Sequence, residues 1–232
     1  MSLGTSFAPG SRETSRGASG KSSTTPTTAA LAPPSTDTSV LSRVIVQQSD
    51  VGSTLNVVLL PSGDQVSQPT LDLCNGTYAT ESQRTTRLQD VVQDTSGNTV
   101  MSTEAVLYQS AADSARAFQE LKSVAASCPS TPVQSPVGEP SVTTKFDPAP
   151  DARWPASPAG VDRLAFSFTT TDAQGRSTPS VATYLRRGKA LIGVYFSEPT
   201  MPQPTVGGQS SIPTIVNVFA SRLAQLPASN VS

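Results

Sequence analysis

The chain has no histidine, only two cysteines, and few aromatic residues, which make up 5% of its 232 residues. Without histidine there is no Ser-His or Cys-His nucleophile, no imidazole base near neutral pH and no imidazole ligand for a metal ion. No G-x-S-x-G elbow, S-x-x-K pair or kinase motif occurs either. These absences favour a protein that is not an enzyme and needs no metal or other cofactor.

Charge and long apolar runs are also scarce. Sixteen basic and 17 acidic residues give a net charge of −1 without a basic stripe, which argues against nucleic-acid binding. No apolar run reaches the length of a membrane span, and the chain does not start like a signal peptide. We expect that any export signal has been removed, and an amino-terminal lipid or membrane anchor upstream is compatible with the sequence.

Residues 1–39 consist almost throughout of Ser, Thr, Pro, Ala and Gly, with Leu3, Phe7 and Leu31 as the bulky apolar residues. Such a segment buries too little surface to offset the entropy of ordering it. We therefore predict a disordered tether that holds a single domain, residues 40–232, away from a membrane or wall. A plain linker is the alternative.

The two cysteines, Cys74 and Cys128, lie 54 positions apart. This spacing is not a C-x-x-C redox or zinc motif, and no further cysteine or histidine could complete a tetrahedral site. We expect a disulfide, which would close a loop of about 55 residues, contribute ~4 kcal/mol and indicate export. Two reduced thiols in the core are the alternative.

In the first half of the domain, residues 54–60 are typical of a buried strand, and residues 87–93 and 100–108 of a hairpin with a short polar turn. Alternation places Glu104 opposite the apolar face of its strand, so we interpret it as a solvent-exposed position rather than an acid or base. Next, Ser110 with Asp113 predicts the start of a helix that runs to Cys128. One face of that helix contains Ala111, Ala115, Phe118, Leu121, Ala125 and Cys128.

In the second half, the Pro-rich residues 129–159 are interpreted as a long loop. Residues 162–171, 181–187 and 190–196 then predict an antiparallel meander. A closing helix follows, with Pro213 in its first turn and Pro227 after its end. The expected fold class is α+β, an antiparallel β-sheet flanked by helices, with a loose β-β-β-α duplication.

Two stretches, TEAVLYQSAADSARAFQELKSVAASCP and SVATYLRRGKALIGVYF, resemble the extracellular sensor domain of PknH-type actinobacterial receptor kinases and related exported lipoproteins. The resemblance covers residues 40–227. It implies an α+β domain outside the membrane with a cleft for a ligand. Those sensor domains have two disulfides, and only the Cys74–Cys128 pair carries over. Because this chain has no kinase motif, the resemblance implies the lipoprotein form.

Candidate ligand-binding residues are of two kinds. A basic turn could bind an anionic lipid headgroup, a phosphate or a wall polymer, or serve only solubility. Three aromatic residues could line an apolar or glycan pocket, or belong to the core. The basic group is Arg186, Arg187 and Lys189, and the aromatic group is Trp154, Tyr184 and Tyr195.

These observations predict an exported, non-enzymatic sensor domain of lipoprotein type that binds a small molecule, lipid or glycan of the cell envelope in a cleft. The alternative is a module that binds or scaffolds an envelope protein without a small ligand. A third hypothesis, a hydrolase that uses carboxylates, would give Glu104 the role of acid or base.

Overall fold

The computed structural model describes residues 36–69, 73–76, 78–134, 141–147 and 150–232, so most of the expected tether lies outside the described residues. The α-helices and strands are, in chain order, α1 (Thr36–Leu41), β1 (Asn56–Leu59), β2 (Arg84–Gln93), β3 (Thr99–Tyr108), α2 (Ala111–Ala126), β4 (Val142–Asp147), β5 (Asp162–Asp172), β6 (Ser177–Arg187), β7 (Ala190–Ser197), α3 (Ile212–Gln225) and α4 (Ala228–Val231). Single 3-10 turns occupy Gln48–Asp50, Leu73–Asn75, Ala79–Gln83 and Pro150–Arg153.

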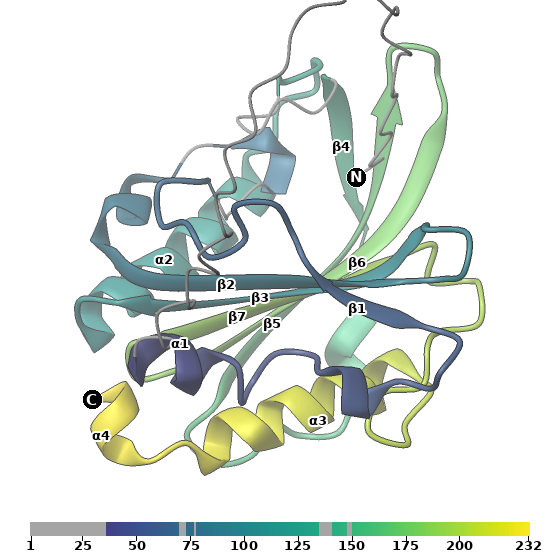
Figure 1. Ribbon diagram of the computed structural model, residues 1–232. Coiled ribbons are helices and arrows are strands. Elements are labelled where there is room, and N and C mark those ends of the chain that lie inside the picture. Colours follow the sequence, from purple (N-terminus) through teal and green to yellow (C-terminus); the bar gives the residue numbers. More distant parts are fainter. Residues whose placement is uncertain (1–35, 70–72, 77, 135–140, 148–149) are drawn as a thin grey trace, which may run out of the picture.

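The seven strands form one antiparallel sheet in the order β1-β2-β3-β7-β6-β5-β4 (Figure 1). Helices pack on both sides of this sheet, so the predicted α+β class is confirmed. The expected hairpin and the expected meander are both present as β2–β3 and β5–β6–β7. Most strands are slightly longer than predicted because cross-strand pairing continues into their polar ends. The exception is β1: the predicted buried strand over residues 54–60 is only four residues long, and Val58 and Leu59 are exposed because it lies at the sheet edge.

One strand was not predicted. β4 lies within the Pro-rich connection and pairs with β5, with Phe146 opposite Phe168. The prediction of an unbroken loop over residues 129–159 was therefore wrong. The prolines on both sides concealed a six-residue segment that pairs with β5, although Val142, the two threonines and Phe146 are residue types enriched in strands.

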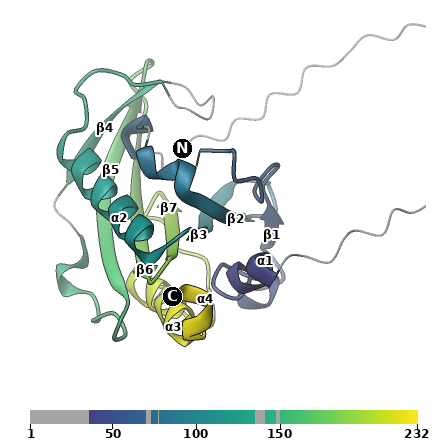
Figure 2. The ribbon, with the colours of Figure 1, turned by 90° about the vertical axis from the view of Figure 1, so that its left-hand side faces the viewer.

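The expected duplication holds for the order of elements, since β1-β2-β3-α2 is followed by β5-β6-β7-α3. The two halves meet in the middle of the sheet, where β3 pairs with β7. Figure 2 shows α2 in front of the strands, whereas α3 lies below them. The two helices contact opposite faces, so the chain repeats its order without repeating its three-dimensional arrangement.

The sheet face covered by α1 and α3, called here the α3 face, carries the larger apolar core. Alternate residues of β3, β6 and β7 point into it, and α3 contributes its buried stripe. Its fully buried members include Met101, Leu107, Leu185, Ile192, Phe196, Phe219 and Leu223.

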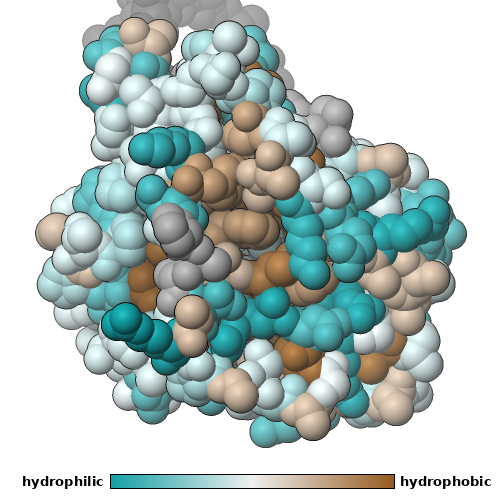
Figure 3. Space-filling view, turned by 180° about the vertical axis from the view of Figure 1, so that it is seen from behind, coloured by the Kyte–Doolittle hydropathy of each residue, from teal (hydrophilic) through white to brown (hydrophobic). Residues whose placement is uncertain are grey.

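The opposite face, called the α2 face, carries a second core beneath α2. The predicted helix start is confirmed, because the Ser110 hydroxyl accepts a hydrogen bond from the Asp113 N–H at 3.2 Å. Val106, Tyr184 and Leu191 of the sheet pack against Phe118 and other residues of the helix. Further apolar side chains are only partly buried here, and Figure 3 shows hydrophobic side chains gathered in a hollow on the back of the molecule.

A disulfide joins Cys74 and Cys128, whose Cα atoms are 5.7 Å apart. The predicted link between the first long helix and the segment after the first strand is thus present. One detail was wrong: α2 ends at Ala126, so Cys128 lies beyond the helix and is half-buried. The capping N–H of Ser127 bonds the Val124 carbonyl and closes the last turn before the cysteine.

Candidate functional site

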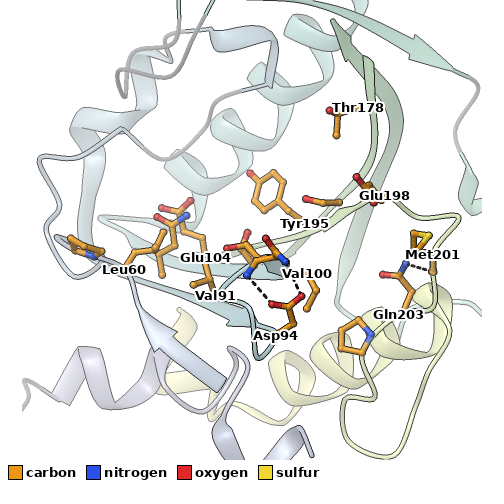
Figure 4. Close-up of a pocket in the computed structure, with 18 of the residues that line it drawn as sticks. Leu60, Val91, Asp94, Val100, Glu104, Thr178, Tyr195, Glu198, Met201 and Gln203 are labelled. Atoms are coloured by element: carbon orange, nitrogen blue, oxygen red, sulfur yellow. Dashed lines mark hydrogen bonds between the residues drawn. The ribbon is translucent and has the colours of Figure 1, made fainter. Parts of the chain in front are cut away.

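The α2 face holds a cavity of about 840 Å³ (Figure 4). Its floor comes from neighbouring strands, where Val91 of β2, Ser102 of β3 and Tyr195 of β7 lie side by side in register. Helix α2 packs on the same face toward the other ends of these strands, around Val106 and Leu191. A space of this size is within the range of pockets that bind small molecules.

One wall of the cavity is a strap, defined here as residues 60–69. Two buried arginines of β2 hold its carbonyl oxygens. Arg84 donates to Val66 at 2.7 Å and to Gln68 at 2.8 Å, and Arg87 donates to Ser62 at 2.9 Å. Gly63 fits tightly, since a Cβ there would lie 2.7 Å from the Gln89 carbonyl. The strap is therefore fixed to the sheet by its backbone.

The same arginine joins a buried polar cluster in the cavity wall. The Arg87 Nε donates to Glu104 at 2.5 Å, and its Nη2 donates to the Gln89 side chain. The side chains of Arg87 and Glu104 are only 4% and 5% exposed. Glu104 is thus not the solvent-exposed residue that we predicted. The alternation was interpreted correctly, but this second face is covered as well, by the strap.

The opposite wall is the rim, defined here as residues 197–204. Its first turn is fixed by two backbone bonds, from Glu198 to the Pro179 carbonyl at 3.0 Å and from Met201 to the Glu198 carbonyl at 2.9 Å. Glu198 has a φ of 51°, a left-handed conformation that non-glycine residues rarely adopt. This places an exposed carboxylate at the cavity mouth (Figure 4).

The turn of the β2–β3 hairpin closes the lower side of the cavity. Asp94 accepts hydrogen bonds from the backbone N–H groups of Ser96 and Asn98 at 2.8 and 2.9 Å. The side-chain hydrogen bond from Asn98, with these backbone bonds, holds the pKa of Asp94 below its usual value. The turn is built by polar side chains, as its sequence predicts.

Aromatic side chains link the cavity to the far edge of the sheet. The hydroxyls of Tyr195 and Tyr184 lie 2.8 Å apart, and their rings meet edge to face at 5.7 Å. Phe166 continues the row at 6.2 Å from Tyr184, and Phe146 of β4 at 5.6 Å from Phe166. The cavity floor thus joins a rigid aromatic layer.

Of the six predicted ligand-binding residues, Tyr195 lines this cavity and Tyr184 lies directly behind it. Trp154 does not line it; this ring packs against the α3-face core with the Arg163 guanidinium over it at 5.5 Å. The predicted site therefore does not assemble as one group around this cavity.

The basic turn also lies apart from the cavity. Arg186 pairs with Asp162, and Arg187 donates to the Leu223 and Leu226 carbonyls at the end of α3. The backbone N–H of Lys189 donates to the Val231 carbonyl at 2.8 Å. These contacts join the turn to the carboxyl-terminal helices.

Sequence reasoning missed the arginine cluster and the strap. The signal was present in β2, where Arg84 and Arg87 interrupt a strand that is otherwise suited to burial. Charged residues are rarely buried without partners, so two buried arginines in one strand indicate acceptors on another segment. The carbonyls of the strap are those acceptors.

Two kinds of feature are absent from the described residues. No group of three or more cysteine, aspartate or glutamate side chains in these ranges is placed to hold a metal ion. None of the helices in the described part of the chain is long and apolar enough to cross a membrane.

No protein-family model matches the chain, and no curated protein matches it in sequence. Among solved structures, the fold is similar to the crystal structure of the extracellular domain of PknH from Mycobacterium tuberculosis. The two chains share 14% sequence identity with a TM-score of 0.41, over 83% of this chain and 90% of that one. At these values the likeness concerns the fold alone.

Proposed function

We propose that this protein is a non-enzymatic sensor domain, exported and of lipoprotein type, that binds an envelope-derived ligand in the cavity of the α2 face. The cavity carries the proposal. Its volume of about 840 Å³ suits a small molecule, a lipid headgroup or a short glycan. Its floor is a paired sheet, and its strap is fixed by Arg84 and Arg87, so the site is largely preformed.

The proposed location outside the cytoplasm is supported by the disulfide, because such bonds persist in oxidising compartments. Intact mass after alkylation of the native, never-reduced protein should show no modified cysteine. Two alkylated cysteines would reject both the bond and this argument for export.

A thermal-shift screen against lipids, glycans and cell-wall fragments tests ligand binding. The variant Thr178→Trp places a large side chain in the cavity, since Thr178 lines it. Its neighbour Ser177 is exposed and lies outside the cavity lining, so Ser177→Trp is the matched control. We expect a melting shift that Thr178→Trp abolishes and Ser177→Trp retains. No shift with any class, or an equal shift in both variants, would count against the proposal.

One observation favours the alternative, a module that binds an envelope protein. Val58 and Leu59 of the edge strand β1 are 39% and 49% exposed, and exposed apolar residues at a sheet edge favour protein contacts. Gln48 already bonds the Leu55 carbonyl and the Val57 N–H, so contact would use side chains. A photo-crosslinker at Leu59 should then trap one protein in cells, and one at exposed Gln174 should not.

A further inference from the structure

We infer that the cavity takes a ligand with a positively charged group, a protonated amine or a guanidinium, beside an apolar part. This inference rests on the proposed function. Among the described residues that line the cavity, three carboxylates stand against a single guanidinium, so this part of the wall carries an excess of two negative charges. In a cavity with protein walls this excess attracts cations and repels anions. The carboxylates are Asp94, Glu104 and Glu198, and the guanidinium is Arg87.

The Arg87 guanidinium, the one cation among the described lining residues, is already engaged with protein groups. Each of the three nitrogens of Arg87 already donates a hydrogen bond, to Glu104, to the Ser62 carbonyl and to Gln89. Its side chain is 4% exposed, and its charge is neutralised by the Glu104 carboxylate. An incoming anion would have to break this cluster and leave Glu104 buried without its partner, which is costly.

The carboxylate available to a cation is Glu198. It stands at the cavity mouth, and no ion pair within the described ranges involves it. Asp94 differs, because hydrogen bonds from its own turn already occupy both of its oxygens. Asp94 therefore adds negative charge to the wall, and Glu198 offers direct contact.

The apolar part of the ligand follows from the rest of the lining. Val91, Val100, Tyr195, Met201 and Pro202 contribute side chains to the same cavity, and Figure 4 shows Tyr195 between Glu104 and Glu198. A cationic group paired with Glu198 would therefore have a ring or alkyl chain beside apolar surface. Hydrogen bonds from Ser102 and Thr178 could orient a polar linker between the two parts.

Three fragments of similar size test the charge. Benzylamine is cationic near neutral pH, benzyl alcohol is neutral and benzoate is anionic. Each is titrated into isotopically labelled protein while the backbone amide signals of Ser102, Tyr195 and Glu198 are followed by NMR. We expect benzylamine to shift these signals with a dissociation constant at least threefold below that of benzyl alcohol, and benzoate to leave them unmoved.

A matched pair of variants locates the charge. Glu198→Gln removes one negative charge at the cavity, and Asp147→Asn removes one from an exposed position on the far edge strand β4. Glu198→Gln should weaken benzylamine about threefold to fivefold, the range of an exposed ion pair. Asp147→Asn should leave the affinity for benzylamine unchanged. Added salt should weaken benzylamine binding to the proteins that keep Glu198, but not to Glu198→Gln.

The outcomes separate this inference from the proposed function. If benzoate or benzyl alcohol binds the cavity as tightly as benzylamine, or if Glu198→Gln has no effect, the charge class is wrong and the cavity remains a binding site. If no fragment moves the cavity signals, both the charge class and the proposed ligand site are rejected.

Discussion

The two faces of the sheet are formed by the same strands but differ in what their side chains build. On the α3 face, alternate residues of β3 and β7 are buried under α1 and α3, and apart from Thr103 those from Met101 to Leu107 and from Ala190 to Phe196 are apolar. On the α2 face, the residues between them include Ser102, Glu104 and Tyr195, and they line a cavity. The α3 face carries the larger apolar core, whereas the α2 face combines a smaller core with a polar cavity wall. The main apolar core and the proposed binding cavity therefore lie on opposite faces of the sheet.

The largest effect on stability is expected on the α3 face. Phe219 of α3 is fully buried in the core there. Phe219→Ala should lower the free energy of unfolding by about 4 kcal/mol, because it leaves a cavity that the core cannot fill. Urea denaturation measures the loss. A loss below about 1 kcal/mol would show that the α3-face core is not more closely packed than the α2 face.

The next effect is expected in the polar cluster. Arg87→Ala should cost about 3 kcal/mol, because it removes the guanidinium that pairs with the buried Glu104 carboxylate. The strap should also lose its bond at Ser62, so hydrogen exchange of residues 60–69 should speed up. The double variant Arg87→Met with Glu104→Leu should recover much of the stability. If it is as unstable as Arg87→Ala, the buried Glu104 charge is not the cause.

A pH effect on stability is expected from an aspartate on the α3 face. Asp90 lies on β2 between Leu88 and Val92, which belong to the α3-face core. Burial raises the pKa of Asp90 to about 6 from 3.8. Because the folded pKa exceeds the unfolded one, the stability that Asp90 contributes when protonated is lost as the pH rises from about 4 to 6.

Asp90→Asn should accordingly match the wild type near pH 4 and be more stable at pH 7, by about 1 kcal/mol after discounting for the partial exposure of the group. Urea denaturation at both pH values tests this expectation. A constant difference between the two proteins would contradict the assignment of the titration to Asp90.

The smallest effect concerns the cavity floor. Tyr195→Phe removes the hydroxyl that bonds Tyr184 and should cost about 1 kcal/mol or less. The ring remains, so the aromatic layer and the cavity shape should persist. The fragment titrations should therefore give nearly wild-type affinity, and a large loss of affinity would mean that the hydroxyl itself contacts the ligand.

Much of the fold could be predicted because its signals are local. The alternation in β3, the Ser110 cap and the apolar stripe of α3 each depend on residues close in the chain. β4 escaped prediction because the prolines around it favoured a loop and its pairing with β5 is not visible in the sequence. The end of α2 was placed two residues too late, because spacing alone continues a helical face beyond its last hydrogen bond.

The candidate site was far less predictable. Tyr195 was selected for its aromatic character, but Glu104 was interpreted as exposed because alternation cannot tell whether a second layer covers the other face. The basic turn 186–189 was predicted to bind a ligand because of its charge. In the structure Arg186 pairs with Asp162, and Arg187 donates to a carbonyl near the end of α3.

The sequence by itself determined the order of the main elements apart from β4, the number and spacing of the cysteines and the lack of histidine chemistry, because these depend on composition and on short-range periodicity. Only the tertiary structure decided where the cavity lies. Strap, hairpin and rim come from residues near 60, 95 and 200, and their meeting depends on the pairing of β2, β3 and β7 and on arginine contacts across the fold. Such contacts between distant segments leave no periodic trace in one chain.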